Sequence, residues 1–333
     1  MRTETNKIQP LVSIVYPVYG VENYIEESLK SLLNQSYSNI EIVIVNDGSK
    51  DNSMEIVHKI LKDDIKYNII NQNNSGLPTA RNTGFNKCNG EFVCFIDSDD
   101  IISDTHIENL VNALLIENET KIAYSDFEIT SMKDRYGSSL NKFNGIQLDY
   151  ALFIEEFLTR KRKIHCCSLL INRKFLIDEK LTFNVNLTYG EDVDFMWRLF
   201  TVVNKIIYVP IKSYKYLVRK NSLMTSQNIE KVVRLVTTFE LTSTLASSNL
   251  MKMGIDLPSE VLHSRVSFGA IHAFARNSTY KQLRQLLAEI DYKSIKKGFS
   301  EYPDFKMRLL SMFLTSKSFL LYLIFKIEKF IFI

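Results

Sequence analysis

The sequence predicts an α/β protein with a doubly wound, mostly parallel sheet, followed by a C-terminal helical extension. Apolar runs typical of strands alternate with helical periodicity between residues 12 and 115. The strand-like runs are apolar at nearly every position, as in parallel sheets covered by helices on both faces. From about residue 227 onward, only helical patterns remain. We therefore expect two domains, residues 1–225 and residues 226–333.

Strands are expected where β-branched and apolar residues run together. The first of them should end before Pro17, because proline has no N–H for a sheet. Helices are expected where apolar residues recur every three or four positions. The expected strands cover residues 12–16, 40–45, 67–70, 92–96 and 206–209. The expected helices cover residues 21–33, 54–61, 77–85, 107–115 and 190–200. Residues 132–187 show no pattern clear enough to assign.

Polar clusters follow the first four expected strands, at residues 17–19, 47–49, 73–76 and 97–100. Parallel strands end at the same edge of a sheet, and such sheets bind ligands at the carboxyl ends of their strands. The sequence therefore predicts one ligand site, assembled from these four loops.

The strongest candidate for metal binding is the pair Asp97 and Asp99, which directly follows a buried strand. Two carboxylates at positions i and i+2 can converge on one hard cation. A cation held there can bind a diphosphate and offset the negative charge of a leaving group. The alternative is a solvated acidic turn that caps the next helix.

Asp47 and Gly48 follow the second strand. Such a carboxylate can accept hydrogen bonds from a base or ribose, and the glycine permits a sharp turn. The alternative is an ordinary strand-to-helix turn.

Glu191 and Asp192 precede Trp197 at the start of an expected helix. A carboxylate on the acceptor side can take the proton from an attacking hydroxyl. We place Glu191 and Trp197 on that side as well. The alternative for the two acids is complementation of the helix dipole.

Arg219, in a turn-like segment that ends at Ser222, can clamp a diphosphate through charge-assisted hydrogen bonds. The alternative is a solvated basic loop. His165 can be a metal ligand, but five histidines without metal-binding spacing favour a structural or surface role.

The net charge of +3 on 333 residues is too small for a typical nucleic-acid-binding protein, so no nucleic-acid partner is expected. The cysteines form no C-x-x-C pair, which argues against zinc. We expect Cys94 to be a buried free thiol in a reducing compartment. Residues 1–7 lack an apolar signal core, and no apolar run is long enough to span a bilayer. These features favour a cytoplasmic protein.

Seven segments, taken in order, resemble family 2 glycosyltransferases of the GT-A (Rossmann-like) fold. They are residues 12–19, 42–49, 73–76, 80–82, 95–100, 190–192 and 219–222. One departure from the family pattern is Gly20, where these proteins often have asparagine.

The resemblance implies roles for the matching residues. Pro17, Tyr19 and Glu22 would line the nucleotide pocket, and Asp47 would contact the nucleoside. Asn74, Gly76 and Arg81 would lie along the nucleotide and donor sugar, together with Asp97, Arg219 and Ser222. Asp99 would be the closer metal ligand of the Asp97–Asp99 pair, and Asp192 would be the general base.

The implied reaction is an inverting, metal-dependent transfer from a nucleotide-diphosphate sugar, with UDP the most frequent nucleotide in the family. The implied cofactor is Mn²⁺ or Mg²⁺. A bacterial polysaccharide or lipid-linked oligosaccharide is the implied acceptor.

Three rival functions would each need other features. A nucleotidyltransferase would need a glycine-rich phosphate loop with a basic residue near the first strand, and residues 16–20 lack one. A non-catalytic nucleotide-sugar-binding protein would need neither Asp99 nor Asp192. A processive membrane polymerase would need spanning helices.

Residues 307–333 are rich in Phe, Leu and Ile and carry four basic residues against Glu328. This composition suits a helix lying in a membrane interface, with its lysines at anionic headgroups. The alternative is a final helix buried against preceding helices or in a homodimer interface.

Overall fold

The computed structural model describes residues 9–61, 65–116, 119–130, 143, 145–218, 228–302, 308–309, 312 and 322–323. The chain forms two compact units. The first, here called the sheet unit, comprises Met1–Asp149, Lys163–Thr182 and Lys205–Val218. The second, the helical unit, comprises Tyr150–Arg162, Phe183–Asn204 and Arg219–Ile333. The predicted domain boundary at residue 225 stays a prediction.

The sheet unit begins with four parallel strands in the order β3-β2-β1-β4. They are β1 (Val12–Val18), β2 (Ile40–Asn46), β3 (Lys66–Asn71) and β4 (Phe92–Phe95). Val12 of β1 pairs with Ile40 of β2 on one side and with Phe92 of β4 on the other. These four strands confirm the predicted parallel core of the sheet.

The sheet continues beyond β4 with strands of mixed direction, in the order β8-β6-β9-β5. They are β5 (Ile101–Ile102), β6 (Ile122–Thr130), β7 (Ile146–Gln147), β8 (Leu169–Asn172) and β9 (Ile207–Leu217). Strand β8 runs antiparallel to β4 and β6, whereas β9 runs parallel to β6. Strands β5 and β7 pair antiparallel with β9.

Pro17 lies inside β1, so the prediction that it ends the strand is wrong. Val15 accepts a hydrogen bond from Ile96 N, which places the polar groups of Val15 toward β4. Backbone groups alternate sides along a strand, so the missing N–H of Pro17 falls on that same side. The pairing with β4 has ended by then, at Val15–Phe95, and no ladder bond is lost.

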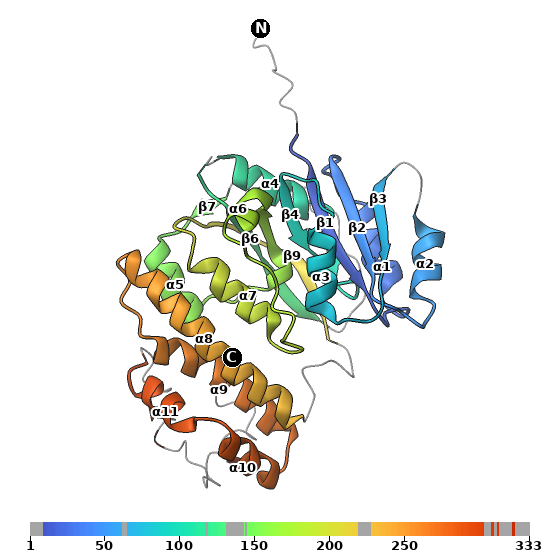
Figure 1. Ribbon diagram of the computed structural model, residues 1–333. Helices are drawn as coiled ribbons and strands as arrows, with labels where there is room; N and C mark the ends of the chain where they lie inside the picture. The colour runs from blue at the N-terminus through green and yellow to red at the C-terminus, as the bar shows by residue number, and fades with distance from the viewer. Residues whose placement is uncertain are drawn as a thin grey trace. The chain divides into compact units, whose positions relative to one another are not determined.

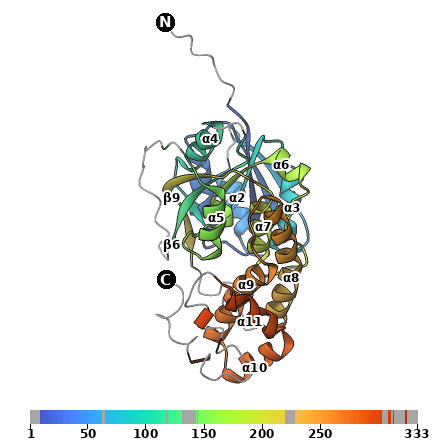
Figure 2. The same ribbon diagram turned by 90° about the vertical axis from the view of Figure 1, so that its left-hand side faces the viewer.

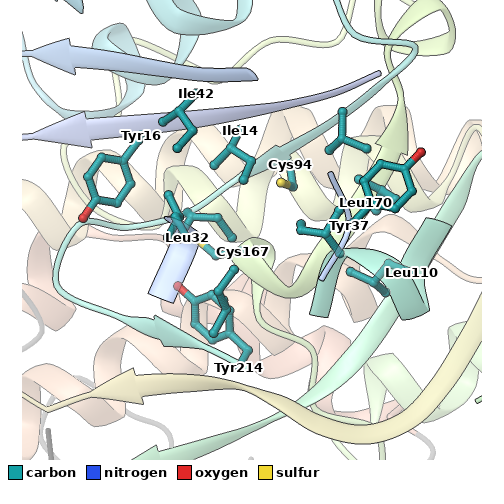
Figure 3. Close-up of a cluster of buried hydrophobic side chains, with 14 of the residues drawn as sticks. Ile14, Tyr16, Leu32, Tyr37, Ile42, Cys94, Leu110, Cys167, Leu170 and Tyr214 are labelled. Atoms are coloured by element: carbon teal, nitrogen blue, oxygen red, sulfur yellow. The ribbon is translucent and has the colours of Figure 1, made fainter. Parts of the chain in front are cut away.

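Helices cover both faces of the sheet, as predicted (Figure 1). The helices of this unit are α1 (Ile25–Leu33), α2 (Ser53–Ile60), α3 (Leu77–Phe85), α4 (His106–Ile116) and α6 (Arg173–Asp178). Apolar residues of α1 and α4 pack with Ile14 and Ile42 in one core, which also contains the buried free thiol of Cys94 (Figure 3). On the opposite face α3 packs closely, since a Cβ on Gly84 would lie 2.5 Å from Val15 Cγ1.

The core of the sheet unit also contains a fully buried histidine, His106, whose Nδ1 lies 2.7 Å from Ser213 Oγ. Burial lowers the pKa of His106 to about 3. The unfolded chain binds this proton below about pH 6.5, whereas the folded protein does not bind it until about pH 3.

We therefore predict that His106 makes the free energy of unfolding fall as the pH drops below about 6.5. The loss is about 1.4 kcal/mol per pH unit and levels off near pH 3. Denaturant melts of wild type and His106→Gln at pH 7, 5.5 and 4.5 measure it, because carboxylate contributions cancel in the comparison. The stability of His106→Gln should depend less on pH. The exposed His58→Gln is the control, and equal slopes for wild type and His106→Gln would refute the prediction.

The helical unit contains α5 (Tyr150–Leu158), α7 (Glu191–Phe200), α8 (Ile229–Lys252), α9 (Ser259–Asn277), α10 (Tyr280–Glu289) and α11 (Tyr292–Ser300) (Figure 2). Val232, Val236 and Phe239, on the face predicted for α8, are buried. Helix α11 packs closely on α9, because a Cβ on Gly298 would lie 2.0 Å from the Glu260 carbonyl oxygen. No helix within the described ranges is both long and apolar enough to cross a membrane.

Candidate active site

Asp47, at the end of β2, organises the loop that leads from β3 to α3. Its buried carboxylate accepts hydrogen bonds from Gln72 Nε2 at 2.7 Å, Ser75 N at 2.9 Å and Gly76 N at 3.0 Å. Gly48 has φ +75°, and a Cβ there would lie 2.9 Å from Asn74 N. Only glycine combines that backbone conformation with that approach. The structure therefore brings Asp47, Asn74 and Gly76 together.

The loop after β1 is tied to the loop after β2. Gly20 N donates to Ser49 Oγ at 2.9 Å, and Glu22 accepts from both Asn52 N and Asn52 Nδ2 at 3.1 Å. Tyr19 is half exposed at this edge, and Pro17 is buried beneath it. Gly20 has φ +67°, with nothing within 4 Å of an added Cβ. Asparagine also tolerates that conformation, so the departure at Gly20 fits the local backbone.

Arg81 and Asp97 form a close ion pair. Arg81 comes from α3, is 2% exposed, and places its Nη2 at 2.7 Å from Asp97 Oδ1. Burial opposes ionisation of Asp97, but the nearby Arg81 and His165 outweigh it and hold the pKa of this carboxyl below its usual value. Asp97 is thus a carboxylate at neutral pH, with a fixed orientation.

Asp99 and Asp100 complete the acidic loop, here defined as residues 97–100, and both are buried. Asp100 accepts from Tyr214 Oη at 2.5 Å and from Leu217 N at 2.8 Å, which fastens the acidic loop to β9. Burial raises the pKa of Asp100 well above its usual value, and the charges of Asp99 and Asp97 add to the rise. The crowding of negative charge is what a bound cation would relieve.

The residues present fit a divalent cation shared with a ligand better than a cation held by the protein alone. Asp97 and Asp99 offer the hard oxygen donors that Mg²⁺ and Mn²⁺ prefer. Within the described ranges, no group of three or more His, Cys, Asp or Glu side chains is arranged to hold a metal ion. Mg²⁺ in proteins commonly takes one or two carboxylates and completes its shell with phosphate oxygens and water.

His165 lies beside the acidic loop in a position that matches a structural role. Its Nδ1 accepts from Cys167 N at 3.3 Å, and its ring stacks on Tyr214 with centroids 5.0 Å apart. Tyr216 lies on a further side of the ring, at a centroid distance of 5.2 Å. The nitrogen used in the turn is no longer available to a metal.

In the helical unit, Glu191 and Asp192 form the first turn of α7, and Asp192 is partly exposed. The preceding Gly190 has φ +76°, and a Cβ there would lie 2.6 Å from Leu235 Cδ1 of α8. The buried Asp194 accepts from Arg198 of its own helix and from Thr242 of α8. Helix α8 therefore fixes the end of α7 that carries Asp192.

Trp197 is only 2% exposed and packs on Phe157 with ring centroids 4.9 Å apart. Its position is that of a core side chain, which gives no support to a role facing an acceptor. That role stays an untested prediction. Arg219 and Ser222 lie outside the described residues, as does most of the segment 307–333.

The sequence does not predict two hydrogen-bonded pairs near the site, Asp100 with Tyr214 and Asp194 with Thr242. The partners are 114 and 48 residues apart. The only sequence signal for Asp100 is its place as the fourth residue of the polar run 97–100. The only signal for Asp194 is that it is a third acid in the first turn of its helix.

Residues 13–178 match the family model described as glycosyl transferase family 2. The chain is 34% identical over 218 residues to glycosyltransferase GlyA of Streptococcus pneumoniae, which covers 64% of this chain and 31% of GlyA. It is 28% identical over 225 residues to glycosyltransferase GlyG of the same organism, covering 65% of this chain and 74% of GlyG. The chain thus spans about a third of the length of GlyA.

Two solved structures share the fold. S. aureus TarS in complex with UDP-GlcNAc superposes with a TM-score of 0.71 at 19% identity, covering 95% of this chain and 90% of that one. The mannosyltransferase PcManGT from Pyrobaculum calidifontis, in complex with GDP-Man and Mn²⁺, gives a TM-score of 0.54 at 14% identity, covering 97% and 89%.

The sheet and the likeness to these two solved structures define a fold of the GT-A type. The chain belongs to glycosyl transferase family 2.

Proposed function

We propose that the protein transfers a sugar from a nucleotide-diphosphate donor to an acceptor hydroxyl, with inversion of the anomeric configuration. The observation that carries the proposal is the edge of the sheet unit, where the acidic loop, the Arg81–Asp97 ion pair and the loops held by Asp47 meet. Pro17, Tyr19, Glu22, Asn74 and Gly76 are the further residues proposed to line the nucleotide and donor sugar, with Arg219 and Ser222 beyond them.

In the proposed reaction, Asp192 takes the proton of the acceptor hydroxyl. A bond forms between that oxygen and the anomeric carbon while the bond from the anomeric carbon to the diphosphate oxygen breaks. The electron pair leaves with the nucleoside diphosphate. Asp97 and Asp99 would hold Mn²⁺ or Mg²⁺, which when bound offsets the charge on the diphosphate. Arg81 keeps Asp97 ionised and oriented for this purpose.

UDP is the nucleotide we propose. The UDP-GlcNAc complex of TarS supports this choice, and the GDP-Man and Mn²⁺ complex of PcManGT supports a divalent cation. The acceptor we propose is a glycan or a lipid-linked oligosaccharide. The composition of residues 307–333 supports the proposal that this segment binds the inner face of the cell membrane.

We predict that an α-linked donor gives a β-linked product, because a single displacement from the opposite face inverts the anomeric carbon. The enzyme is incubated with each UDP-sugar and Mn²⁺, UDP release is measured, and proton NMR of the early product gives its anomeric coupling. UDP release identifies the donor and excludes a protein that only binds nucleotide sugars. An α-linked early product would contradict the inverting mechanism.

A further inference from the structure

Helix α9 carries three basic residues and a glycine whose spacing of four, three and four places them on one face. They are Arg265, Gly269, His272 and Arg276. Arg160, just after α5, lies against the same face, because its Nη2 is 3.5 Å from the point where a Cβ on Gly269 would stand. All of these residues belong to the helical unit. We call Arg160, Arg265 and Gly269 the arginine cradle.

Arg265 is held rigidly although it is charged. It is 8% exposed, and its Nε donates to the Leu158 carbonyl oxygen at 2.8 Å. The same oxygen accepts from Tyr302 Oη at 2.5 Å. Within the described ranges Arg265 forms no ion pair, and its Nη1 lies 3.6 Å from the Cβ position of Gly269. Two guanidinium groups therefore approach the same point beside Gly269, where the glycine leaves out a side chain.

The side chain of Arg160 contacts solvent, but protein atoms surround part of it. Its side chain is exposed, yet burial lowers its pKa, while Tyr302 and Tyr189 partly offset that effect. Its backbone has φ +58°, which non-glycine residues rarely adopt and which is often found at functional sites.

The surroundings of the cradle are basic. Burial, then the charges of Arg276 and Arg160, lower the pKa of His272 to about 4. His272 is therefore neutral at pH 7 and can supply a hydrogen bond without adding charge. An anion is the ligand that this arrangement favours, and forked guanidinium groups match phosphate oxygens.

The cradle and the proposed base are neighbours of the same tyrosine. Burial raises the pKa of Tyr189 to about 12, the charge of Asp192 adds to the rise, and the charge of Arg160 opposes it. Tyr189 thus lies within electrostatic reach of Arg160 and of Asp192.

We propose that the arginine cradle binds a phosphate or diphosphate group of the acceptor. The inference rests on the proposed function and names the acceptor's chemistry: it carries phosphate. A lipid-linked diphosphate and a phosphodiester polymer present the same group.

Calorimetric titration with inorganic pyrophosphate, in saturating UDP and Mn²⁺, tests the proposal, because UDP already fills the donor site. Wild type should bind one pyrophosphate. Arg160→Gln and Gly269→Val, the second of which fills the space and keeps both arginines, should each weaken binding by about tenfold or more. Arg234→Gln is the matched control, since Arg234 is a half-exposed arginine of α8 paired with Glu230. A UDP titration of each variant checks its folding.

Protein that binds UDP but no pyrophosphate, or variants that bind it as tightly as wild type, overturns the cradle and leaves the proposed function intact. Protein that does not bind UDP refutes the proposed function itself. Competition of pyrophosphate with vesicles containing a polyprenyl diphosphate, or with a soluble glycerol-phosphate oligomer, identifies the source of the phosphate. Either competition supports the cradle.

Discussion

Asp192→Asn is expected to lower turnover by about two to four orders of magnitude. The amide preserves the shape of the side chain but cannot take the proton from the acceptor hydroxyl. Asp192 stands in the first turn of α7, and the backbone of that turn is fixed by Gly190 against Leu235 and by Asp194 with Thr242. The substitution should therefore leave the helix in place.

The measurement is initial rate against donor and acceptor concentration, together with the affinity for UDP. Donor affinity should change by less than about twofold, because the lost interaction belongs to the transition state. Glu191→Gln is the matched control, since it removes the neighbouring carboxylate, which is 9% exposed. Near-normal turnover of Asp192→Asn would move the base elsewhere, and a large loss in Glu191→Gln would identify Glu191.

Removal of the divalent cation, or of Asp99, is expected to reduce activity by at least about a hundredfold. A diphosphate and the acidic loop repel each other without a positive charge between them. Burial raises the pKa of Asp100 well above its usual value, and the negative charges of Asp99 and Asp97 in the same loop raise it further. Asp99→Asn keeps the shape while it removes one ligand charge, so it should weaken UDP binding in Mn²⁺ as well as turnover.

The test compares UDP release and UDP affinity with Mn²⁺, with Mg²⁺ and with excess chelator. Asp104→Asn, a short distance further along the chain and outside the acidic loop, controls for the loss of a nearby charge. Full activity in excess chelator would show that the cation has no part in the reaction.

The parallel half of the sheet could be predicted because its signals are local. Strands β1, β2 and β4 are apolar at most positions, and α1 and α4 show helical spacing. In the mixed half only the start of β9 was predicted, as residues 206–209. Strands β5 and β7 could not be predicted, since they are two residues long and owe their existence to pairing with β9.

The candidate site also has a part that local sequence predicts and a part that it does not. Asp47 and the acidic loop were found because each directly follows an apolar strand. The tie from Asp100 to Tyr214 is set by tertiary pairing, which no spacing in the sequence records. Trp197 shows the limit of such local patterns: it packs on Phe157 in the core, and its expected place on the acceptor side stays a prediction.

The three hydrogen bonds of Asp47 make two loops a single cooperative element. One carboxylate holds Gln72 Nε2 and the amides of Ser75 and Gly76, so its acceptor capacity is largely used before any nucleoside arrives. A nucleoside that contacts Asp47 has about one acceptor position left to use, or it replaces one of these bonds. If the proposed nucleotide pocket includes Asp47, we expect amide hydrogen exchange at Ser75 and Gly76 to change when a nucleotide binds.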